Sequence, residues 1–482
     1  MSRLNSGVKL HVTVTDDFNM QIPSNPNGPA SRREFLKKTA IASAAVAAAP
    51  LLRPTVYGQA PSANVIGANS KINVGYIGVG GQGFNAHVKI MHNNASANNI
   101  AQVAVCDVWE KRVKRATDFL GADCKGFGSY KEMLNAVGDK MDAVVIATHD
   151  PIHAPASIAA LEKGKHVYCE KPLTRYLGEA FAVQDAVKKS GKILQVGSQG
   201  CSAAGWQKSA ELIKAGKIGT PVWAQGYYCR NSGPDSPIKG EWNYALDSDA
   251  DKNPPNWEAW LGQVHKRPAF SKEHYFRWRK FFPYCAGLLG DLVPHRLFPL
   301  VLATGNPEFP KRVVCVGTKN VHSDKHDDGG ALERDVAEHC EVIAEFPSGL
   351  TLVIVTSTVA ARSPGFVIYG HHASLDIGNA GERVQLTPEK EFSEEVDMAS
   401  FDGLTPAEDI GVHHKNWFDC IRSGNQPNAN IDLAVRVQTV ISLAEMSDRL
   451  GAACYFDEKT RKITTMGGTE IKPITYGTLE LS

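Results

Sequence analysis

A glycine-rich segment near residue 80 has the spacing that holds a pyrophosphate. A short predicted strand from residue 71 to 77 runs into Gly78-x-Gly80-x-x-Gly83, and a helix is predicted to follow. Glycines permit a tight turn and let the backbone approach a phosphate, which then lies against the amino end of the helix. The sequence therefore predicts a dinucleotide-binding loop, whose contacts come from Gly78, Gly80, Gly81, Gln82 and Gly83.

A carboxylate follows the next predicted strand, which covers residues 100–106. Asp107 lies about two dozen residues beyond Gly83. A carboxylate at this place can accept hydrogen bonds from both hydroxyls of an adenosine ribose, and it repels a 2′-phosphate. Asp107 therefore favours NAD over NADP, while Lys111 and Arg112 close by keep the phosphate-binding alternative open.

An acid and a histidine stand four residues apart in Asp291-Leu292-Val293-Pro294-His295. On a helix this spacing would place both side chains on one side of a turn. Oxidation of an alcohol by a nicotinamide needs a base that takes the hydroxyl proton, and a histidine titrates in the right range. In the alternative interpretation, His295 is a core histidine and Asp291 caps a helix.

Alternating strands and helices between residues 70 and 200 must position these groups. The strands predicted after residue 106 are 142–147, 166–169 and 192–196, and the helices between them are 154–163 and 177–189. Strands that alternate with helices of this length require right-handed crossovers and a mostly parallel sheet. The ligand of such a sheet lies beyond the carboxyl ends of its strands.

The residues directly after those strands carry a resemblance to a known family. They include Ala147-Thr148-His149-Asp150-Pro151-Ile152-His153 and Glu170-Lys171-Pro172, and Trp278-Arg279 follows later in the chain. Together with the glycine motif they resemble the Gfo/Idh/MocA oxidoreductases, the glucose-fructose oxidoreductase and inositol dehydrogenase family. The resemblance extends from residue 71 to about residue 457.

This resemblance implies an α/β fold with two domains. A Rossmann domain that binds NAD(P) is expected over about 70–200, and a substrate and oligomerisation domain over 201–457, with a tail at 458–482. The second domain should be α+β with a large open, mainly antiparallel sheet, whose face often serves in homo-oligomers. Strand-like runs at 312–317, 340–346, 350–358 and 366–370 and helical periodicity at 415–421 and 433–450 agree with this expectation.

The resemblance also implies roles for individual residues. His295 would be the proton acceptor, Asp291 a substrate-positioning or proton-relay group, and Lys171 the cation that holds the reacting hydroxyl beside the nicotinamide. The residues expected near the cofactor, besides the glycine-rich loop and Asp107, are Thr148, His153, Glu170 and Lys171. The residues expected near the substrate are Trp278, Arg279 and Tyr284.

The chain departs from the family pattern around the histidine. Many members have a glycine between the acid and the histidine and a second acid three residues after it, whereas this chain has Val293-Pro294 and Phe298. Phe298 removes a contact to a polyol, which leaves the substrate open. His413-His414 begins a predicted helix and is a further candidate to reach the site.

The function that fits is an NAD(P)-dependent oxidoreductase with a tightly bound cofactor, acting on a secondary hydroxyl of a sugar, polyol or glycoside. A second hypothesis is a glycosidase that oxidises its sugar transiently with bound NAD and then eliminates the aglycone. A third is a sugar-binding or NAD-binding protein without catalysis.

The first 60 residues resemble an export signal. Ser31-Arg32-Arg33-Glu34-Phe35-Leu36-Lys37-Lys38 precedes an apolar run over 40–52, as in the twin-arginine (Tat) pathway for folded proteins. The run is too short to span a bilayer, for which about 20 apolar residues are needed. We expect cleavage after Ala60 and a periplasmic or exported protein without a transmembrane domain; a short buried helix or a membrane anchor is the alternative.

The composition excludes some classes of partner. The formal net charge is +1, and it becomes −3 without the first 60 residues, so no basic footprint for nucleic acid is expected. The 10 cysteines contain no C-x-x-C pair and indicate buried thiols rather than a disulfide framework. The His and Asp residues in 322–328 are interpreted as an exposed loop, and no metal site is predicted.

Overall fold

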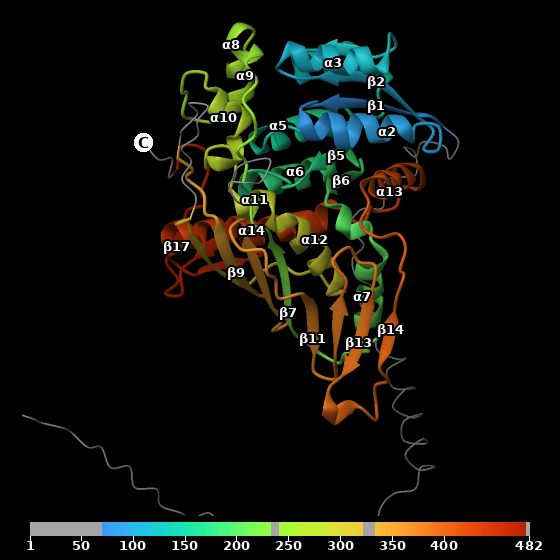
Figure 1. The fold of residues 1–482 in the computed structure, drawn as a ribbon, viewed down its shortest axis with the longest axis vertical. Coiled ribbons are helices and arrows are strands. Elements are labelled where there is room, and N and C mark those ends of the chain that lie inside the picture. Colours follow the sequence, from blue (N-terminus) through green and yellow to red (C-terminus); the bar gives the residue numbers. More distant parts are fainter. Residues whose placement is uncertain (1–69, 233–240, 322–332, 479–482) are drawn as a thin grey trace, which may run out of the picture. The chain divides into compact units, whose positions relative to one another are not determined.

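The computed structural model describes residues 70–232, 241–321 and 333–478 (Figure 1). The predicted export signal in residues 1–60 and the histidine- and aspartate-rich segment 322–328 lie outside the described residues.

The first domain is the predicted parallel sheet with helices on both faces. Six parallel strands lie in the order β3-β2-β1-β4-β5-β6, so the strand order reverses between β1 and β4. The central strands are buried on both faces, as in doubly wound sheets. The strands are β1 (Ile72–Ile77), β2 (Ile100–Cys106), β3 (Lys125–Phe127), β4 (Ala143–Ile146), β5 (His166–Glu170) and β6 (Leu194–Gly197). The helices are α2 (Lys89–Asn93), α3 (Glu110–Leu120), α4 (Tyr130–Val137), α5 (Asp150–Glu162) and α6 (Leu177–Ser190). This part of the fold prediction is confirmed, and a crevice for a ligand is expected where the strand order reverses.

The helix after the glycine-rich loop begins irregularly. Its first turns, Gly83–Val88 (η2), have π-helical hydrogen bonding, and a regular turn, α2, follows. π-Helical turns are rare and are frequent at functional sites. The next helix boundary that differs from the prediction is that of α5, which begins at Asp150 instead of Ala154 because Pro151 is accommodated in its first turn.

The second domain contains an open sheet of 11 strands among the described residues. Their order is β14-β13-β12-β11-β7-β10-β9-β8-β15-β16-β17, and all recorded pairs are antiparallel except β7 with β10. The central strands are β7 (Pro221–Cys229), β8 (Arg312–Thr318), β9 (His339–Glu345), β10 (Thr351–Ser357) and β11 (Phe366–Gly370). The strands toward the two edges are β12 (Ala373–Ile377), β13 (Val384–Pro388), β14 (Ala399–Phe401), β15 (Cys454–Asp457), β16 (Lys462–Thr464) and β17 (Glu470–Ile471). The predicted mainly antiparallel sheet is confirmed. Residues expected as a tail after 457 add β16 and β17 to one edge.

Helices cover one face of this sheet. α7 (Ala204–Lys214), α12 (Val293–Ala303) and α14 (Ile431–Leu450) pack against its strands, and the burial of side chains alternates along β9 and β10 (Figure 1). Alternating burial is typical of a sheet with one face packed on a core. Four short helices precede α12 in the chain: α8 (Asp249–Lys252), α9 (Trp257–Leu261), α10 (Lys272–Phe276) and α11 (Leu288–Asp291).

Late segments of the chain pack back onto the first domain. Trp417 and Phe418 of α13 (Ile410–Ser423) are fully buried in the same apolar cluster as β1. At the junction with α14, the Arg175 guanidinium donates two hydrogen bonds of 2.7 Å to the carboxylate of Glu445. Both side chains are almost completely buried, so an ion pair joins the two domains.

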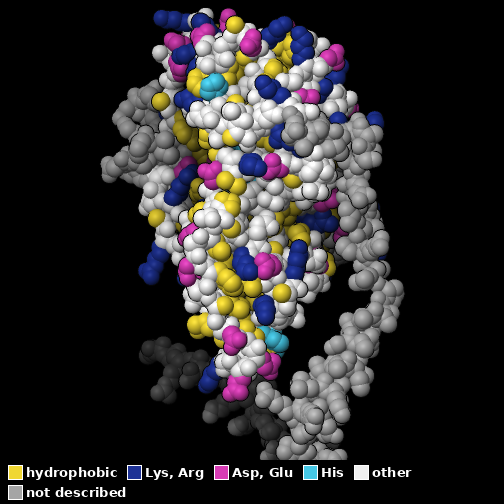
Figure 2. Space-filling view, turned by 90° about the vertical axis from the view of Figure 1, so that its right-hand side faces the viewer, with side chains coloured by type: hydrophobic (Ala, Val, Ile, Leu, Met, Phe, Trp, Pro, Cys, Tyr) yellow, Lys and Arg dark blue, Asp and Glu magenta, His cyan; other side chains and the backbone are white. Residues whose placement is uncertain are grey.

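The surface carries charges of both signs. On the face in Figure 2, acidic and basic side chains are interspersed, without an extended basic patch. Within the described ranges no helix has the length and apolar character needed to cross a bilayer, and no group of three or more His, Cys, Asp or Glu side chains is arranged to hold a metal ion. The 10 cysteines are free thiols, nine of them buried.

Candidate functional site

A cavity of about 930 Å³ lies at the carboxyl ends of β1, β2 and β4. One wall is the glycine-rich loop and the end of β2, and the opposite wall comes from the aromatic segment of the second domain. The side chains that line it include Gln82, Asp107, Arg112, Thr148, Tyr275, Trp278 and Arg279. The cavity therefore lies where a doubly wound sheet binds its ligand.

The backbone conformation and close packing of the loop leave no room for a side chain at Gly78 or Gly83. Gly78 has a φ of +86°, and a Cβ atom there would stand 2.7 Å from the carbonyl oxygen of Ala147. A Cβ atom on Gly83 would stand 2.0 Å from the carbonyl oxygen of Gly78. Gly81 has open space beside it and lines the cavity. The loop thus combines a left-handed turn, close packing of helix on strand, and an exposed backbone.

Asp107 is buried, and backbone amides hold its carboxylate. Oδ2 accepts from the amide of Val79 at 3.0 Å, and Oδ1 accepts from the amide of Trp109 at 3.0 Å. Each carboxylate oxygen can accept more than one hydrogen bond, so the carboxylate retains acceptors for ribose hydroxyls. Its place on the cavity wall is the one that the sequence predicts for the ribose carboxylate.

Replacing Asp107 by alanine is expected to weaken NADH binding about tenfold to a hundredfold, because two ribose hydroxyls lose a charged acceptor. The dissociation constant for NADH, measured by fluorescence titration, tests this expectation. Asp118, an exposed residue of α3 in the same domain, provides the control, since Asp118→Ala should leave the constant unchanged. An unchanged constant in Asp107→Ala would contradict the placement of the ribose.

The two cationic side chains near Asp107 differ in their ion-pair partners and in their position relative to the cavity. Lys111 is paired with Asp247 at 2.7 Å and with Asp249 at 2.5 Å, so its ammonium is already neutralised. The Arg112 guanidinium lies over the rings of Trp109 and Tyr275 and stands 3.9 Å from Asp107. Because Arg112 lines the cavity, recognition of a 2′-phosphate would depend on it rather than on Lys111.

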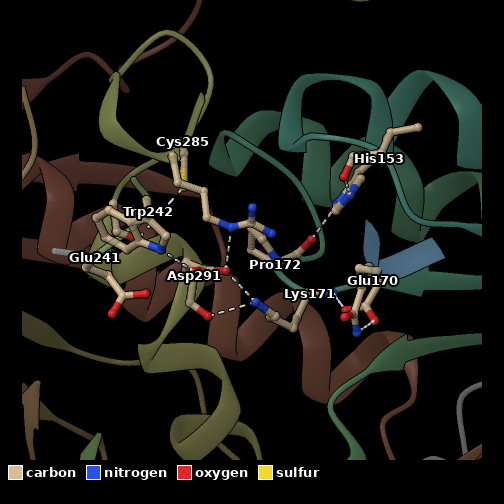
Figure 3. Close-up of polar contacts among 12 residues, drawn as sticks. His153, Glu170, Lys171, Pro172, Glu241, Trp242, Cys285 and Asp291 are labelled. Atoms are coloured by element: carbon tan, nitrogen blue, oxygen red, sulfur yellow. Dashed lines mark hydrogen bonds and ion pairs between the residues drawn. The ribbon is translucent and has the colours of Figure 1, made fainter. Parts of the chain in front are cut away.

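Asp291 stands at the centre of a buried cluster in the second half of the site (Figure 3). Lys171, which directly follows β5, donates to Asp291 Oδ1 at 2.7 Å and to the Asp291 carbonyl oxygen at 2.8 Å. Arg279 Nε lies 3.0 Å from the same Oδ1, and Trp242 Nε1 donates to Oδ2 at 2.8 Å. Arg279 also lines the cavity, so it connects this cluster to the proposed cofactor site.

The charges of the cluster stabilise one another. Burial would raise the pKa of Asp291, but Arg279 and Lys171 outweigh it and hold this pKa well below its ordinary value. Burial would lower the pKa of Lys171, but Asp291 outweighs it and the pKa is raised. Asp291 is therefore an anion whose two oxygens are occupied, and its chemical role is to hold Lys171 and Arg279 in place.

Trp242 is a member of this cluster that the sequence did not indicate. Its side chain is completely buried, and its backbone has a φ of +64°, a region that residues other than glycine rarely adopt. Such strain persists where the surroundings fix it, often at functional sites. No motif surrounds Trp242, so only the fold could reveal the contact of its indole with Asp291.

His295 is close to this cluster but does not lie on one helix with Asp291. α11 ends at Asp291 and α12 begins at Val293, with Pro294 in its first turn, so the predicted continuous turn is broken. Among the described residues the ring has no hydrogen-bonding partner and packs 5.6 Å from the ring of Tyr228. Burial and the neighbouring Lys171 lower the pKa of His295 to about 3. At neutral pH its imidazole is thus uncharged.

The remaining predicted residues have different surroundings. Thr148, Trp278 and Arg279 line the cavity. His153 is buried, with Nδ1 2.8 Å from the Pro172 carbonyl oxygen and Nε2 3.2 Å from that of Thr148, so it ties the ends of β4 and β5 together. Tyr284 is buried in an aromatic cluster and contacts His274 at 2.7 Å. Glu170 lies beneath the glycine-rich loop, where Gln82 donates to it at 3.2 Å.

Comparison with known families identifies the first domain. Residues 72–198 match the Gfo/Idh/MocA model, described as an oxidoreductase family with an NAD-binding Rossmann fold. The inositol 2-dehydrogenase of Salmonella paratyphi B is 31% identical over 157 residues, which are 32% of this chain and 45% of that protein. The scyllo-inositol 2-dehydrogenase (NAD⁺) of Bacillus subtilis is 34% identical over 125 residues, 26% of this chain and 36% of that protein. The chain thus spans less than half the length of these curated relatives.

Solved structures extend the likeness of the fold to both domains. Levoglucosan dehydrogenase in complex with NADH and levoglucosan superimposes with a TM-score of 0.60 at 18% identity, covering 80% of this chain and 99% of that chain. The aldose-aldose oxidoreductase of Caulobacter crescentus, complexed with glycerol, gives a TM-score of 0.57 at 18% identity, covering 80% and 100%. The two-domain architecture is therefore shared with these oxidoreductases.

Proposed function

We propose that this chain, whose first domain is the NAD-binding Rossmann domain of the Gfo/Idh/MocA oxidoreductases, transfers a hydride between a tightly bound NAD and a secondary hydroxyl of a sugar, polyol or glycoside. The observation that carries the proposal is the position of Arg279. It lines the cavity that the glycine-rich loop and Asp107 form, and it also contacts Asp291, which holds Lys171. A dinucleotide site and a buried lysine are thereby joined through one side chain.

The residues present fit a dinucleotide. The open backbone at Gly81 and the side of Gln82 that lines the cavity would receive the pyrophosphate, and Asp107 would accept from the ribose. When bound, the nicotinamide supplies the hydride acceptor or donor. The aromatic wall of Tyr275, Phe276 and Trp278 offers apolar surface to the cofactor or to a sugar.

Side chains of the protein would remove the proton from the reacting hydroxyl. The Lys171 ammonium stabilises negative charge on the reacting oxygen, which lowers the cost of removing the hydroxyl proton. His295 is the proposed acceptor of that proton because its ring lies beside the Lys171 cluster and has no hydrogen-bonding partner among the described residues, and the reverse reaction returns the proton. Asp291, Arg279 and Trp242 keep the lysine oriented without taking part in proton transfer themselves.

Export and assembly are further parts of the proposal. The twin-arginine segment supports export in the folded state, which agrees with a cofactor that stays bound. The open face of the second-domain sheet supports a homo-oligomer, and no nucleic acid partner is proposed.

The proposal is tested by purifying the full chain and measuring bound NAD after release by acid. The reduced cofactor is then followed by its absorbance with a panel of inositols, aldoses and anhydrosugars, in parallel with nitrophenol release from nitrophenyl glycosides. Net reduction without nitrophenol supports the dehydrogenase. Nitrophenol release without net change in the cofactor would replace it with the oxidation-elimination hydrolase, and sugar binding without either signal would replace it with a non-catalytic protein.

A variant separates chemistry from binding in the same assay. His295→Ala is expected to reduce turnover at least a hundredfold, because the proton acceptor is lost, while the NAD content stays near that of the wild type. The matched control is His371→Ala, an exposed histidine of the second domain. Loss of bound NAD in His295→Ala would contradict the assigned role.

A further inference from the structure

A hydrogen-bonded network of side chains, which includes two buried imidazoles, connects the second domain to the glycine-rich loop. His87 Nδ1 lies 2.9 Å from Nε2 of His414, and His87 Nε2 lies 2.9 Å from Oε1 of Glu170. The same Oε1 accepts from the side-chain amide of Gln82 at 3.2 Å. Four side chains thus connect α13 to the loop, with Glu170 as the acceptor in the centre (Figure 3 shows Glu170 beside Lys171).

Three of these four side chains are shielded from solvent. His87 is 0% exposed, His414 1% and Glu170 6%. Burial would raise the pKa of Glu170, but the hydrogen bond and charge of His87, followed by Lys171, outweigh it and hold that pKa well below its ordinary value. A buried carboxylate of this kind is stable only while its hydrogen-bond donors remain in place.

One hydrogen-bond direction follows from the carboxylate. A carboxylate only accepts, so His87 Nε2 is the donor to Glu170. The other ring nitrogen of His87, Nδ1, is bonded to His414 Nε2. Both ring nitrogens of His87 are therefore engaged, and His414 fixes the orientation in which His87 donates to Glu170.

Gln82 and Glu170, the two members of this side-chain network farthest from α13, contact parts of the proposed site. Gln82 lines the cavity and immediately precedes the π-helical turn that carries His87. Glu170 Oε2 accepts from the backbone amide of Lys171 at 3.1 Å. Movement of His414 would therefore disturb the loop on one side of the cofactor and the start of the Lys171 segment on the other.

We propose that His87 and His414 are positioning residues for the dinucleotide: through Glu170 and Gln82, helix α13 holds the glycine-rich loop in the conformation that receives the pyrophosphate. This inference rests on the dinucleotide-binding function proposed above. It assigns a cofactor-supporting role to a helix that lies more than 300 residues after the loop in the chain.

The test compares two amides at His414, measured in the full chain by titration with NADH. A glutamine amide reaches the place of Nε2, whereas an asparagine amide is one carbon shorter and does not. His414→Asn is expected to weaken NADH binding about tenfold, and His414→Gln to stay within about threefold of the wild type. His166, a buried histidine at the other end of β5, is the control for general destabilisation, and His166→Leu should leave NADH affinity unchanged.

A second pair keeps the proposal falsifiable if His414→Asn does not fold. His87→Gln retains a donor to Glu170 and should bind NADH better than His87→Leu, which removes that donor. Equal affinities of the wild type and all folded variants, or an equal loss in His166→Leu, would overturn the inference. A wild-type chain that binds no NADH would instead overturn the proposed function.

Discussion

Replacing Lys171 by methionine is expected to lower turnover about a hundredfold to a thousandfold while NADH affinity changes by less than about threefold. The ammonium donates to Asp291 at 2.7 Å and, together with burial, lowers the pKa of His295, and removal of one such stabilising group typically costs two to three orders of magnitude in rate. Steady-state kinetics with the best substrate of the panel, together with NADH titration, measures both quantities.

The control for Lys171→Met is Lys163→Met, which changes an exposed lysine just before β5. Its turnover should equal that of the wild type. Lys171→Arg keeps a cation beside Asp291 and so separates folding from chemistry, since it should preserve thermal stability but not the full rate. Turnover of Lys171→Met within tenfold of the wild type would contradict the role of the lysine.

Replacing Arg175 by methionine is expected to destabilise the protein by about 3–5 kcal/mol, because it leaves the buried carboxylate of Glu445 without its bidentate partner. Arg449, 3.0 Å from Glu445, compensates only in part. The midpoint of urea denaturation, followed by fluorescence, measures the effect. Since Arg175 and Glu445 come from different domains, the loss should appear in both.

A double variant tests the reason for this loss. Arg175→Met with Glu445→Met removes both charges, and its midpoint should recover most of the difference, since replacing a whole buried pair by apolar side chains is often neutral. Lys114→Met, which breaks an exposed pair with Asp118, should change stability by no more than about 0.5 kcal/mol. A double variant as unstable as Arg175→Met would show that the pair is not the cause.

The first domain could be predicted from sequence because its signals are local. Strands such as β2 are short apolar runs, the glycines have fixed spacing, and Asp107 follows its strand directly. Each of these patterns is read within about 30 residues, the length of one strand-helix-strand unit. The resemblance to a family added the second sheet, whose alternating strands are weaker signals.

The contacts between distant segments could not be predicted. Trp242 reaches Asp291 across 49 residues, and His414 reaches His87 across 327 residues. The pair His413-His414 was a candidate to reach the site, but its partner could not be named from the sequence. Both contacts depend on tertiary packing rather than on local preference. β7 was not predicted either, although it is an interior strand of the second sheet, because Ala224 and Gly226 give it a weakly apolar pattern.

The broken helix at Asp291 has a local cause that the spacing did not reveal. Two residues four apart suggested one continuous turn, but α11 ends at Asp291, Leu292 lies between the helices, and α12 begins at Val293 with Pro294 in its first turn. Proline lacks an amide proton and is tolerated in a first turn, so it marks a new helix here. Asp291 therefore binds Lys171, Arg279 and Trp242, whereas the His295 ring packs beside Tyr228.

The position of β7 sets the order in which the protein can be assembled during synthesis. Both of its edges bond to strands that lie more than 100 residues later, β10 on one side and β11 on the other. Until the ribosome has released residue 357, this strand has no partner, whereas all six strands of the parallel sheet have already been synthesised. Long-range pairing of this kind is slow, and until it is complete the unpaired strand edges are exposed and prone to aggregation. Nascent chains that stall between residues 230 and 350 are therefore the species most in need of a chaperone.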